Sequence, residues 1–340
     1  MPEPDRQKRV AMASAMEAGG NAPARSRVDI HHHFVPPVWA RELRAGIAET
    51  TRNPALLFDW TPARSLDELA KSGTATAFLS LTNPGLGPVP PPEERRLARA
   101  CNDYAADLVR DHPGRFGAFA VLPLQNIDAG IEEAAYALDI LKLDGIGLMT
   151  SHHGKWPGDA RFAPLFEELN RRRAVVYLHP TVSHCTAQIP DVAPSVIEFP
   201  IETARAVASL LFSGTLARCP GIKWIFSHGG GALPALAERM TRLFDAQSHL
   251  RPRAPAGALA ELQRLYYDTA QATAPAALNA LLSFIPVSQI LFGSDYPMLP
   301  IGNAVEGLAR LGLSAASLDA IERGNAQRVF PRLDAIGNAP

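Results

Sequence analysis

The sequence predicts a (β/α)₈ barrel, and three observations support this fold class. Apolar, β-branched stretches of strand length alternate with helical stretches, which favours parallel strands covered by helices. Eight such strands can be counted, and a chain of 340 residues has room for one barrel. Side chains that can bind metal follow several of these strands, at the face where barrel active sites lie.

The elements are expected in the following order. Residues 1–27 are rich in Ala, Gly, Arg and Met and lack a periodic pattern, so we expect a flexible N-terminal extension before one barrel domain over 28–334. Ser65, with Glu68 three residues later, has the signature of a helix N-cap, and the helix should end at Lys71. Strands are expected over 28–34, 74–81, 116–122, 145–149, 174–178, 223–226, 265–267 and 289–293, and the main helices over 93–111, 129–141, 163–172, 202–213, 233–244, 276–284, 303–312 and 315–328.

Composition and charge exclude several classes of function. The chain is 47% hydrophobic and 20% charged with a net charge of −1, which gives no electrostatic basis for binding nucleic acid or an anionic membrane. No apolar run is long enough to cross a bilayer. Cys101, Cys185 and Cys219 are few, odd in number and widely spaced, which is typical of reduced thiols in a cytoplasmic protein.

The first strand carries a run of three histidines. Side chains alternate faces along a strand, so His31 and His33 share one face and His32 takes the other. Two imidazoles about 7 Å apart on one face can bind one divalent ion. A surface tract or a tag remnant is the alternative, but a tag normally sits at a terminus, whereas this run follows the strand pattern of Val28 and Ile30.

Other ligand-type residues follow later strands. His179 follows the fifth strand, His228 the sixth, Asp268 the seventh and Asp295 the eighth. Taken singly, His179 could be a core histidine and Asp295 a helix cap, but in a barrel all these positions open on the same face. His31, His33, His179 and Asp295 would form a site with three nitrogens and one oxygen that leaves coordination positions open, as a catalytic metal requires; it favours Zn²⁺, with Mn²⁺ as the alternative.

Two further polar residues are assigned to the surroundings of the metal. His228 precedes three glycines, whose missing side chains would let a substrate come close. We expect His228 to carry a proton or donate a hydrogen bond, with bracing of the loop as the alternative. Asp268 is expected to brace a ligand histidine, with direct contact to the substrate as the alternative.

Aromatic residues near these positions are candidates for the walls of the substrate pocket. They are Phe34, Trp60, Phe292 and Tyr296, and core packing is an equal alternative for Phe292. His152 and His153 follow the fourth strand and could reach the pocket, but a solvated loop is the more typical setting.

Four motifs carry a resemblance to a known family. They are Asp-Ile-His-His-His at 29–33, Leu-His-Pro at 178–180, Ser-His-Gly-Gly-Gly at 227–231 and Gly-Ser-Asp-Tyr-Pro at 293–297. In this order they resemble the amidohydrolase superfamily, in the branch of aminocarboxymuconate semialdehyde decarboxylase, over residues 28 to 330. The resemblance implies a (β/α)₈ barrel with one divalent metal on His31, His33, His179 and Asp295, a catalytic His228, and no organic cofactor.

Finer features of the resemblance concern the substrate. The elements Trp60-Thr-Pro, Tyr267-Asp-Thr-Ala and Phe292-Gly-Ser-Asp-Tyr-Pro are more similar to salicylate-type decarboxylases, notably 6-methylsalicylate decarboxylase. The muconate enzyme's carboxylate-binding arginine has no clean match, because Asn53 stands at the aligned position, and Thr181 replaces its tryptophan after His-Pro. Arg239 matches an arginine that reaches the substrate carboxylate of a neighbouring subunit, which implies a homodimer.

The leading hypothesis is therefore a metal-dependent, non-oxidative decarboxylase of a small aromatic or enolic carboxylic acid. The metal would bind the carboxylate and the adjacent hydroxyl, and the ring carbon would be protonated by Asp295 or by a metal-bound water relayed through His228. The alternative enzyme is a metal-dependent hydrolase of a lactone or amide, with His228 as the base. A non-catalytic barrel would be expected to lack one of the four ligands, and none is missing.

Overall fold

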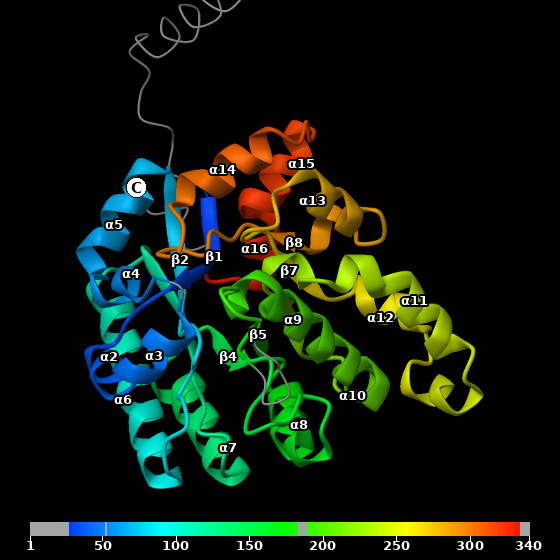
Figure 1. The fold of residues 1–340 in the computed structure, drawn as a ribbon, viewed down its shortest axis with the longest axis horizontal. Coiled ribbons are helices and arrows are strands. Elements are labelled where there is room, and N and C mark those ends of the chain that lie inside the picture. The colour runs from blue at the N-terminus through cyan, green and yellow to red at the C-terminus, as the bar shows by residue number, and fades with distance from the viewer. Residues whose placement is uncertain (1–26, 52, 183–188, 334–340) are drawn as a thin grey trace, which may run out of the picture.

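The structure, a computed structural model, describes residues 27–51, 53–182 and 189–333 (Figure 1). Eight parallel strands pair in the order β1 to β8, and helices surround them, so the predicted (β/α)₈ barrel is confirmed. The expected extension over 1–27 lies outside the described residues except for Arg27, which is the first residue of β1. The strands are β1 Arg27–His33, β2 Thr74–Ser80, β3 Phe116–Ala120, β4 Gly145–Met149, β5 Val175–His179, β6 Lys223–Phe226, β7 Tyr266–Asp268 and β8 Ile290–Leu291.

The barrel closes between its first and last strands without a regular ladder. The backbone N–H of Ile30 donates to Phe292 O at 2.9 Å, and that of His33 donates to Tyr296 O at 2.7 Å. Between them, Asp295 donates its backbone N–H to His31 O at 2.9 Å. The segment that follows β8 therefore lies along β1, and it carries Asp295 to the histidines.

Helices cover the outside of the strands and form most of the connections. The larger ones are α5 Pro62–Lys71, α6 Pro91–Asp111, α7 Ile127–Ala135, α8 Ala163–Arg171, α9 Pro194–Ser213, α11 Leu233–Asp245, α13 Pro275–Leu282 and α14 Ile301–Ala309. The smaller ones are α2 Pro37–Glu42, α3 Arg44–Thr50, α4 Pro54–Phe58, α10 Thr215–Arg218, α12 Ala258–Gln263, α15 Ala315–Asp319 and α16 Asn325–Val329. Within the described ranges, no helix has both the length and the apolar character to cross a membrane.

One predicted helix start is wrong. Helix α5 begins at Pro62, and the side chain of Thr61 caps it by accepting the N–H of Arg64 at 3.2 Å. Proline at the first helical position favours this earlier start, since its fixed φ suits the helix and it has no N–H to satisfy. Ser65 is instead buried inside the helix, where its Oγ lies 2.9 Å from His32 Nε2 and accepts a hydrogen bond from Trp60 Nε1.

Another difference concerns the connection after β5. Helix α9 begins at Pro194, eight residues before the predicted start at 202, and it includes Pro200. The proline inside the helix hid its first two turns, because proline normally ends a helical pattern.

Large side chains fill the interior of the barrel below the site. Phe78, Phe119, Tyr177 and Ile225 are buried in one cluster although they come from different strands around the barrel. Phe330 joins them from the C-terminal segment, with its ring centroid 4.2 Å from that of Phe78. Because one end of the barrel is packed in this way, polar side chains gather at the other end, where the strands finish.

Candidate metal centre

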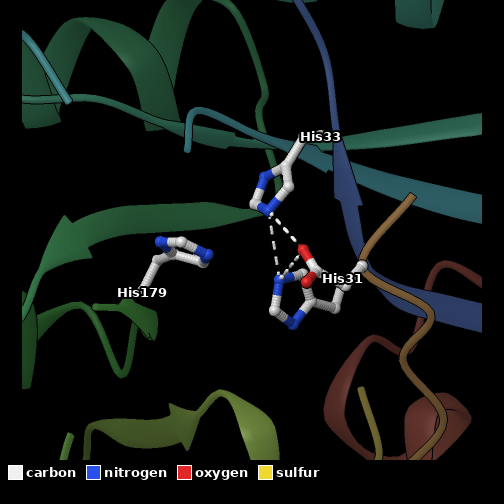
Figure 2. A group of neighbouring side chains, drawn as sticks. His31, His33 and His179 are labelled. Atoms are coloured by element: carbon white, nitrogen blue, oxygen red, sulfur yellow. Dashed lines mark hydrogen bonds and ion pairs between the residues drawn. The ribbon is translucent and has the colours of Figure 1, made fainter. Parts of the chain in front are cut away.

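Four of the predicted residues meet at the C-terminal ends of the strands. His31 and His33 come from β1, His179 is the last residue of β5, and Asp295 follows β8. All four are buried, and each offers one ligand atom within 4.8 Å of the others. Figure 2 shows the three imidazole rings turned toward a common region. The barrel therefore joins residues that lie far apart in the sequence, as the strand-end positions predicted.

The polar atoms of this cluster approach one another closely. His31 Nε2 lies 3.1 Å from His33 Nε2, and Asp295 Oδ1 lies 3.2 Å and 3.0 Å from these two nitrogens. Lone pairs on two nitrogens and a carboxylate oxygen repel one another at such distances unless a proton or a cation lies among them. The donor set of three imidazoles and one carboxylate is one that divalent Zn²⁺ or Mn²⁺ accepts.

The ionisation of the cluster also favours a bound cation. Burial lowers the pKa of His31, but Asp268 and Asp295 reverse this effect and raise it to about 10. Burial keeps the pKa of His33 and His179 below the ordinary value, so both rings are neutral, as metal ligands must be. The two carboxylates thus stabilise a positive charge at His31, and a divalent ion would take the place of that proton.

The carboxyl group of Asp295 is held in its ionised form. Burial by itself raises its pKa, but the charge of His31 and hydrogen bonds from His228, His31 and His33 hold the pKa well below the usual range. Asp295 has φ of 67°, in the left-handed region, and its backbone is fixed by the bond to His31 O. Both features keep an anionic oxygen aimed at the histidines.

Asp268 makes the contact that a bracing role requires. Its Oδ2 lies 2.9 Å from His31 Nδ1, which leaves His31 Nε2 to face the cluster. Its Oδ1 accepts the backbone N–H groups of His228 at 2.9 Å and Ala270 at 3.0 Å. One buried carboxylate therefore orients a candidate ligand and the loop of His228 together.

His228 lies beside the four-residue cluster. It begins the short 3₁₀ turn His228–Gly230 with φ of 55°, and its Nε2 is 3.5 Å from Asp295 Oδ2. Its side chain is 13% exposed, against 4% for Asp295 and 0% for His31. Among these side chains, His228 is thus placed to exchange protons with solvent.

The glycines after His228 have a packing role, and their expected role in substrate approach stays a prediction. A Cβ at Gly231 would lie 2.3 Å from Pro200 O, and one at Gly229 would lie 2.9 Å from Ala272 Cβ. The close packing of this loop against α9 and the segment after β7 therefore requires glycine, whatever a substrate needs.

Sequence reasoning missed several residues of the site. Asp29 is buried and accepts hydrogen bonds from the N–H of His31 at 3.1 Å and from the N–H and hydroxyl of Ser294 at 3.0 and 2.6 Å. It ties β1 to the segment that carries Asp295. Gln271 Nε2 donates to Asp295 Oδ2 from the segment after β7. Asp29 could have been recognised as an acidic residue inside an apolar strand, whereas nothing in the sequence marked Gln271.

The predicted wall residues lie around the site rather than in a described cavity. Phe34 and Phe292 are packed in the core, and Trp60 donates to Ser65. Tyr296 stacks on His32 with ring centroids 4.8 Å apart. Arg239 is exposed on α11. Their contact with a substrate stays a prediction.

A cavity of about 330 Å³ lies between the segments that follow β2, β3, β4 and β5, and its wall contains none of the four cluster residues but includes neighbours of His179. Met149, in its wall, pairs in register with His179, and Thr181 of the wall lies two residues beyond His179. His152 and His153 also line this cavity, and His153 is exposed, as expected for a solvated loop. The loop turns inward because His152 Nε2 accepts the N–H of Met149 at 3.1 Å.

Comparisons with known proteins agree with this geometry. Residues 28–332 match the model of a family described as amidohydrolase. The chain is 38% identical over 328 residues to the decarboxylase macB of Penicillium terrestre, covering 90% of this chain and 95% of that protein. It is 36% identical over 327 residues to the 6-methylsalicylic acid decarboxylase of Penicillium expansum, covering 92% and 98%. The resemblance expected from the four motifs is confirmed.

A solved structure matches the fold over nearly the whole chain. The 5-carboxyvanillate decarboxylase of Novosphingobium aromaticivorans, solved with bound manganese, superposes with a TM-score of 0.81 at 20% identity, covering 92% of this chain and 99% of that chain. At this identity the likeness supports the barrel architecture alone.

Proposed function

This chain belongs to the amidohydrolase family and is one of its metal-dependent, non-oxidative decarboxylases, and we propose a substrate class for it. The proposed reaction removes CO₂ from a 2-hydroxybenzoate of the 6-methylsalicylate type. The observation that carries the proposal is the cluster of His31, His33, His179 and Asp295 with His228 beside it, together with a cavity of about 330 Å³ whose wall includes neighbours of His179. Pockets for small molecules start at about this size, which suits a substrate with one ring.

In the proposed reaction, the bond between the ring and the carboxylate breaks and the ring carbon gains a proton. His31, His33, His179 and Asp295 would hold the ion. When bound, it supplies positive charge that binds and orients the carboxylate and the neighbouring hydroxyl. Burial of these residues excludes water and fixes their charges before the substrate arrives, and this preorganisation lowers the barrier.

Proton delivery is assigned to His228 and Asp295. His228 Nε2 and Asp295 Oδ2 lie 3.5 Å apart, close enough for a proton to pass between them after a small movement of either side chain. The exposed edge of His228 exchanges protons with solvent, and Asp268 fixes its backbone. His228 would therefore replace the proton that each turnover places on the ring carbon.

The metal is proposed to be a single divalent ion. Three imidazoles and one carboxylate suit Zn²⁺, and Mn²⁺, the ion that the 5-carboxyvanillate decarboxylase holds, is the alternative. Elemental analysis of the purified protein would identify the ion, and one equivalent per chain is expected.

Two further assignments accompany the proposal. The described residues from 28 to 333 belong to a single barrel domain. A cytoplasmic location is supported by Cys101 and Cys219, which are free and buried. Cys185 lies outside the described residues.

The proposal predicts CO₂ release from a panel of substituted benzoates. Purified enzyme with one divalent ion should convert 6-methylsalicylate to 3-methylphenol and CO₂ without added cofactor or oxidant, measured by carbon dioxide detection and chromatography of the phenol. Wild-type protein stripped of metal by a chelator is the control. Formation of an acid from a lactone or amide, without CO₂ from any benzoate, would replace this function with hydrolysis.

We also propose a homodimer in which Arg239 of each subunit contacts the substrate carboxylate in the other. Leu236 and Leu243, one turn before and after Arg239 on α11, are 38% and 39% exposed, so this face offers apolar area to a second copy. Helix α11 lies at the outer edge of the molecule, away from β1 and β2 (Figure 1).

Arg239→Ala is expected to raise KM about 10- to 100-fold, because a charge-assisted hydrogen bond to the substrate carboxylate is lost. The fraction of protein present as dimer should change little. Steady-state kinetics and light scattering would measure both. Arg242→Ala, an exposed arginine on the same helix, is the matched control. Co-expression of Arg239→Ala with His228→Ala should restore activity in mixed dimers. Absence of recovery would show that Arg239 does not act across subunits.

A further inference from the structure

Asn83 is a buried residue of the cavity wall with an unused hydrogen-bond donor. It follows β2 and is 3% exposed. The hydroxyl of Thr181 donates to Asn83 Oδ1 at 2.6 Å, which fixes the orientation of the amide. Asn83 Nδ2 is buried and has no hydrogen-bond partner among the described residues. A buried donor left without a partner keeps its full desolvation penalty, and a ligand that accepts its hydrogen bond would remove that penalty.

The Asn83–Thr181 pair lies in the wall of the cavity, and each residue follows shortly after a strand residue linked to the metal cluster. Asn83 is three residues beyond Ser80, whose carbonyl oxygen lies 3.2 Å from His33 Nδ1. Thr181 is two residues beyond His179, and its backbone N–H donates to Thr150 Oγ1 at 3.1 Å. Asn83 thus follows β2, the strand that pairs with the β1 strand of His33, and Thr181 follows β5, the strand of His179.

The rest of the wall indicates which kind of group would meet this donor. The described residues that line the cavity include no lysine or arginine, and Glu94 contributes a carboxylate to the wall. Val121, Leu122 and Met149 supply apolar surface for a ring. A neutral amide donor beside apolar walls fits a hydroxyl oxygen on an aromatic ring better than it fits a carboxylate.

We propose that the Asn83–Thr181 pair recognises the hydroxyl group ortho to the carboxylate of the substrate, with Asn83 Nδ2 donating to its oxygen. The assignment rests on the proposed function, since it presumes a 2-hydroxybenzoate in this cavity. An analogue without the hydroxyl leaves the buried amide unpaired, and sites of this kind reject such analogues strongly. Asn83 is then a residue that determines specificity, and Thr181 is the residue that positions it.

Ligand binding tests this assignment without turnover. We would measure the Kd of 2-hydroxybenzoate and of 2-methylbenzoate, which have nearly the same shape, by calorimetry on metal-loaded protein that carries His228→Ala to suppress turnover, with and without each further substitution. The preference is the ratio of the Kd of 2-methylbenzoate to that of 2-hydroxybenzoate. Asn83→Ala is expected to lower this ratio about 10-fold or more. Thr181→Val should narrow it by a smaller factor, because the donor remains but loses its fixed orientation.

Controls separate recognition from damage to the fold. Asn303→Ala, an exposed asparagine on α14, should leave the ratio of the two Kd values unchanged. Asn83→Asp keeps the shape and loses the N–H donor, so it should narrow the preference even if Asn83→Ala unfolds. Thermal unfolding and metal content should match wild type in the variants that are compared.

The binding experiment can fail or succeed independently of the test for CO₂ release. An unchanged ratio in Asn83→Asp, with both Kd values shifted in parallel or not at all, would overturn the role of Asn83 even if the wild type releases CO₂. A narrowed ratio would support the role even if no benzoate yields CO₂, and in that case the decarboxylase assignment alone would fail.

Discussion

His228→Ala is expected to retain the metal and to lower kcat about 10²- to 10⁴-fold, the range that general acid–base catalysis contributes. Its imidazole lies beside the four-residue cluster, 3.5 Å from Asp295 Oδ2, and it is the most exposed of these side chains. Loss of the ring removes the route by which the proton is replaced after each turnover. CO₂ release and elemental analysis of the same sample would measure the two effects.

A surface histidine provides the control for this variant. His249→Ala changes an exposed residue and should retain both metal and rate. Because Asp268 holds His228 through the backbone N–H, the alanine variant keeps that contact and the loop should stay in place. Loss of the metal from His228→Ala would move His228 into the set of ligands and contradict the division of roles proposed here.

Asp295→Ala is expected to abolish both metal binding and CO₂ release. The variant loses the carboxylate oxygen that faces His31 and His33, and with it part of the negative charge that stabilises a cation. Wild-type protein at about 100 times the Kd of its metal should gain about 2.7 kcal/mol in free energy of unfolding, and the variant should gain nothing. Thermal unfolding with and without added metal would measure this gain.

Two further variants serve as comparisons for Asp295→Ala. Asp319→Ala removes an exposed carboxylate on α15 and should respond to metal as the wild type does. Asp295→Asn keeps the shape of the side chain and should also lose most of the metal, which would separate the loss of charge from the loss of packing. Full occupancy of the metal in Asp295→Ala would contradict the assignment of Asp295 as a ligand.

The sequence predicted the barrel and the cluster because both depend on a regular pattern. The strands at 145–149 and 223–226 were placed to the residue, since β-branched and apolar runs mark buried strands. His31, His33, His179 and Asp295 could be grouped because parallel strands in a barrel bring their carboxyl ends to one face. The predicted barrel topology therefore indicated which residues lie close together, although the sequence contains no distances.

The lining of the pocket could not be predicted in the same way. Asn83, His152 and His153 are loop residues, and their positions depend on contacts such as that between Asn83 and Thr181 across two loops. The aromatic candidates were chosen by closeness to motifs, and Phe34 and Phe292 proved to be packed in the core. Residues that act through tertiary contacts, such as Gln271, leave no periodic signal.

The closure of the barrel between β1 and the segment after β8 has a consequence for biosynthesis. His33 and Asp295 are separated by 262 positions, so the carboxylate emerges from the ribosome long after the histidines of β1. A growing chain that ends before residue 290 lacks both the last strand of the barrel, β8, and Asp295, the proposed anionic ligand. We therefore expect the ion to bind fully only to completed chains, so that metal occupancy would report that the whole barrel has folded.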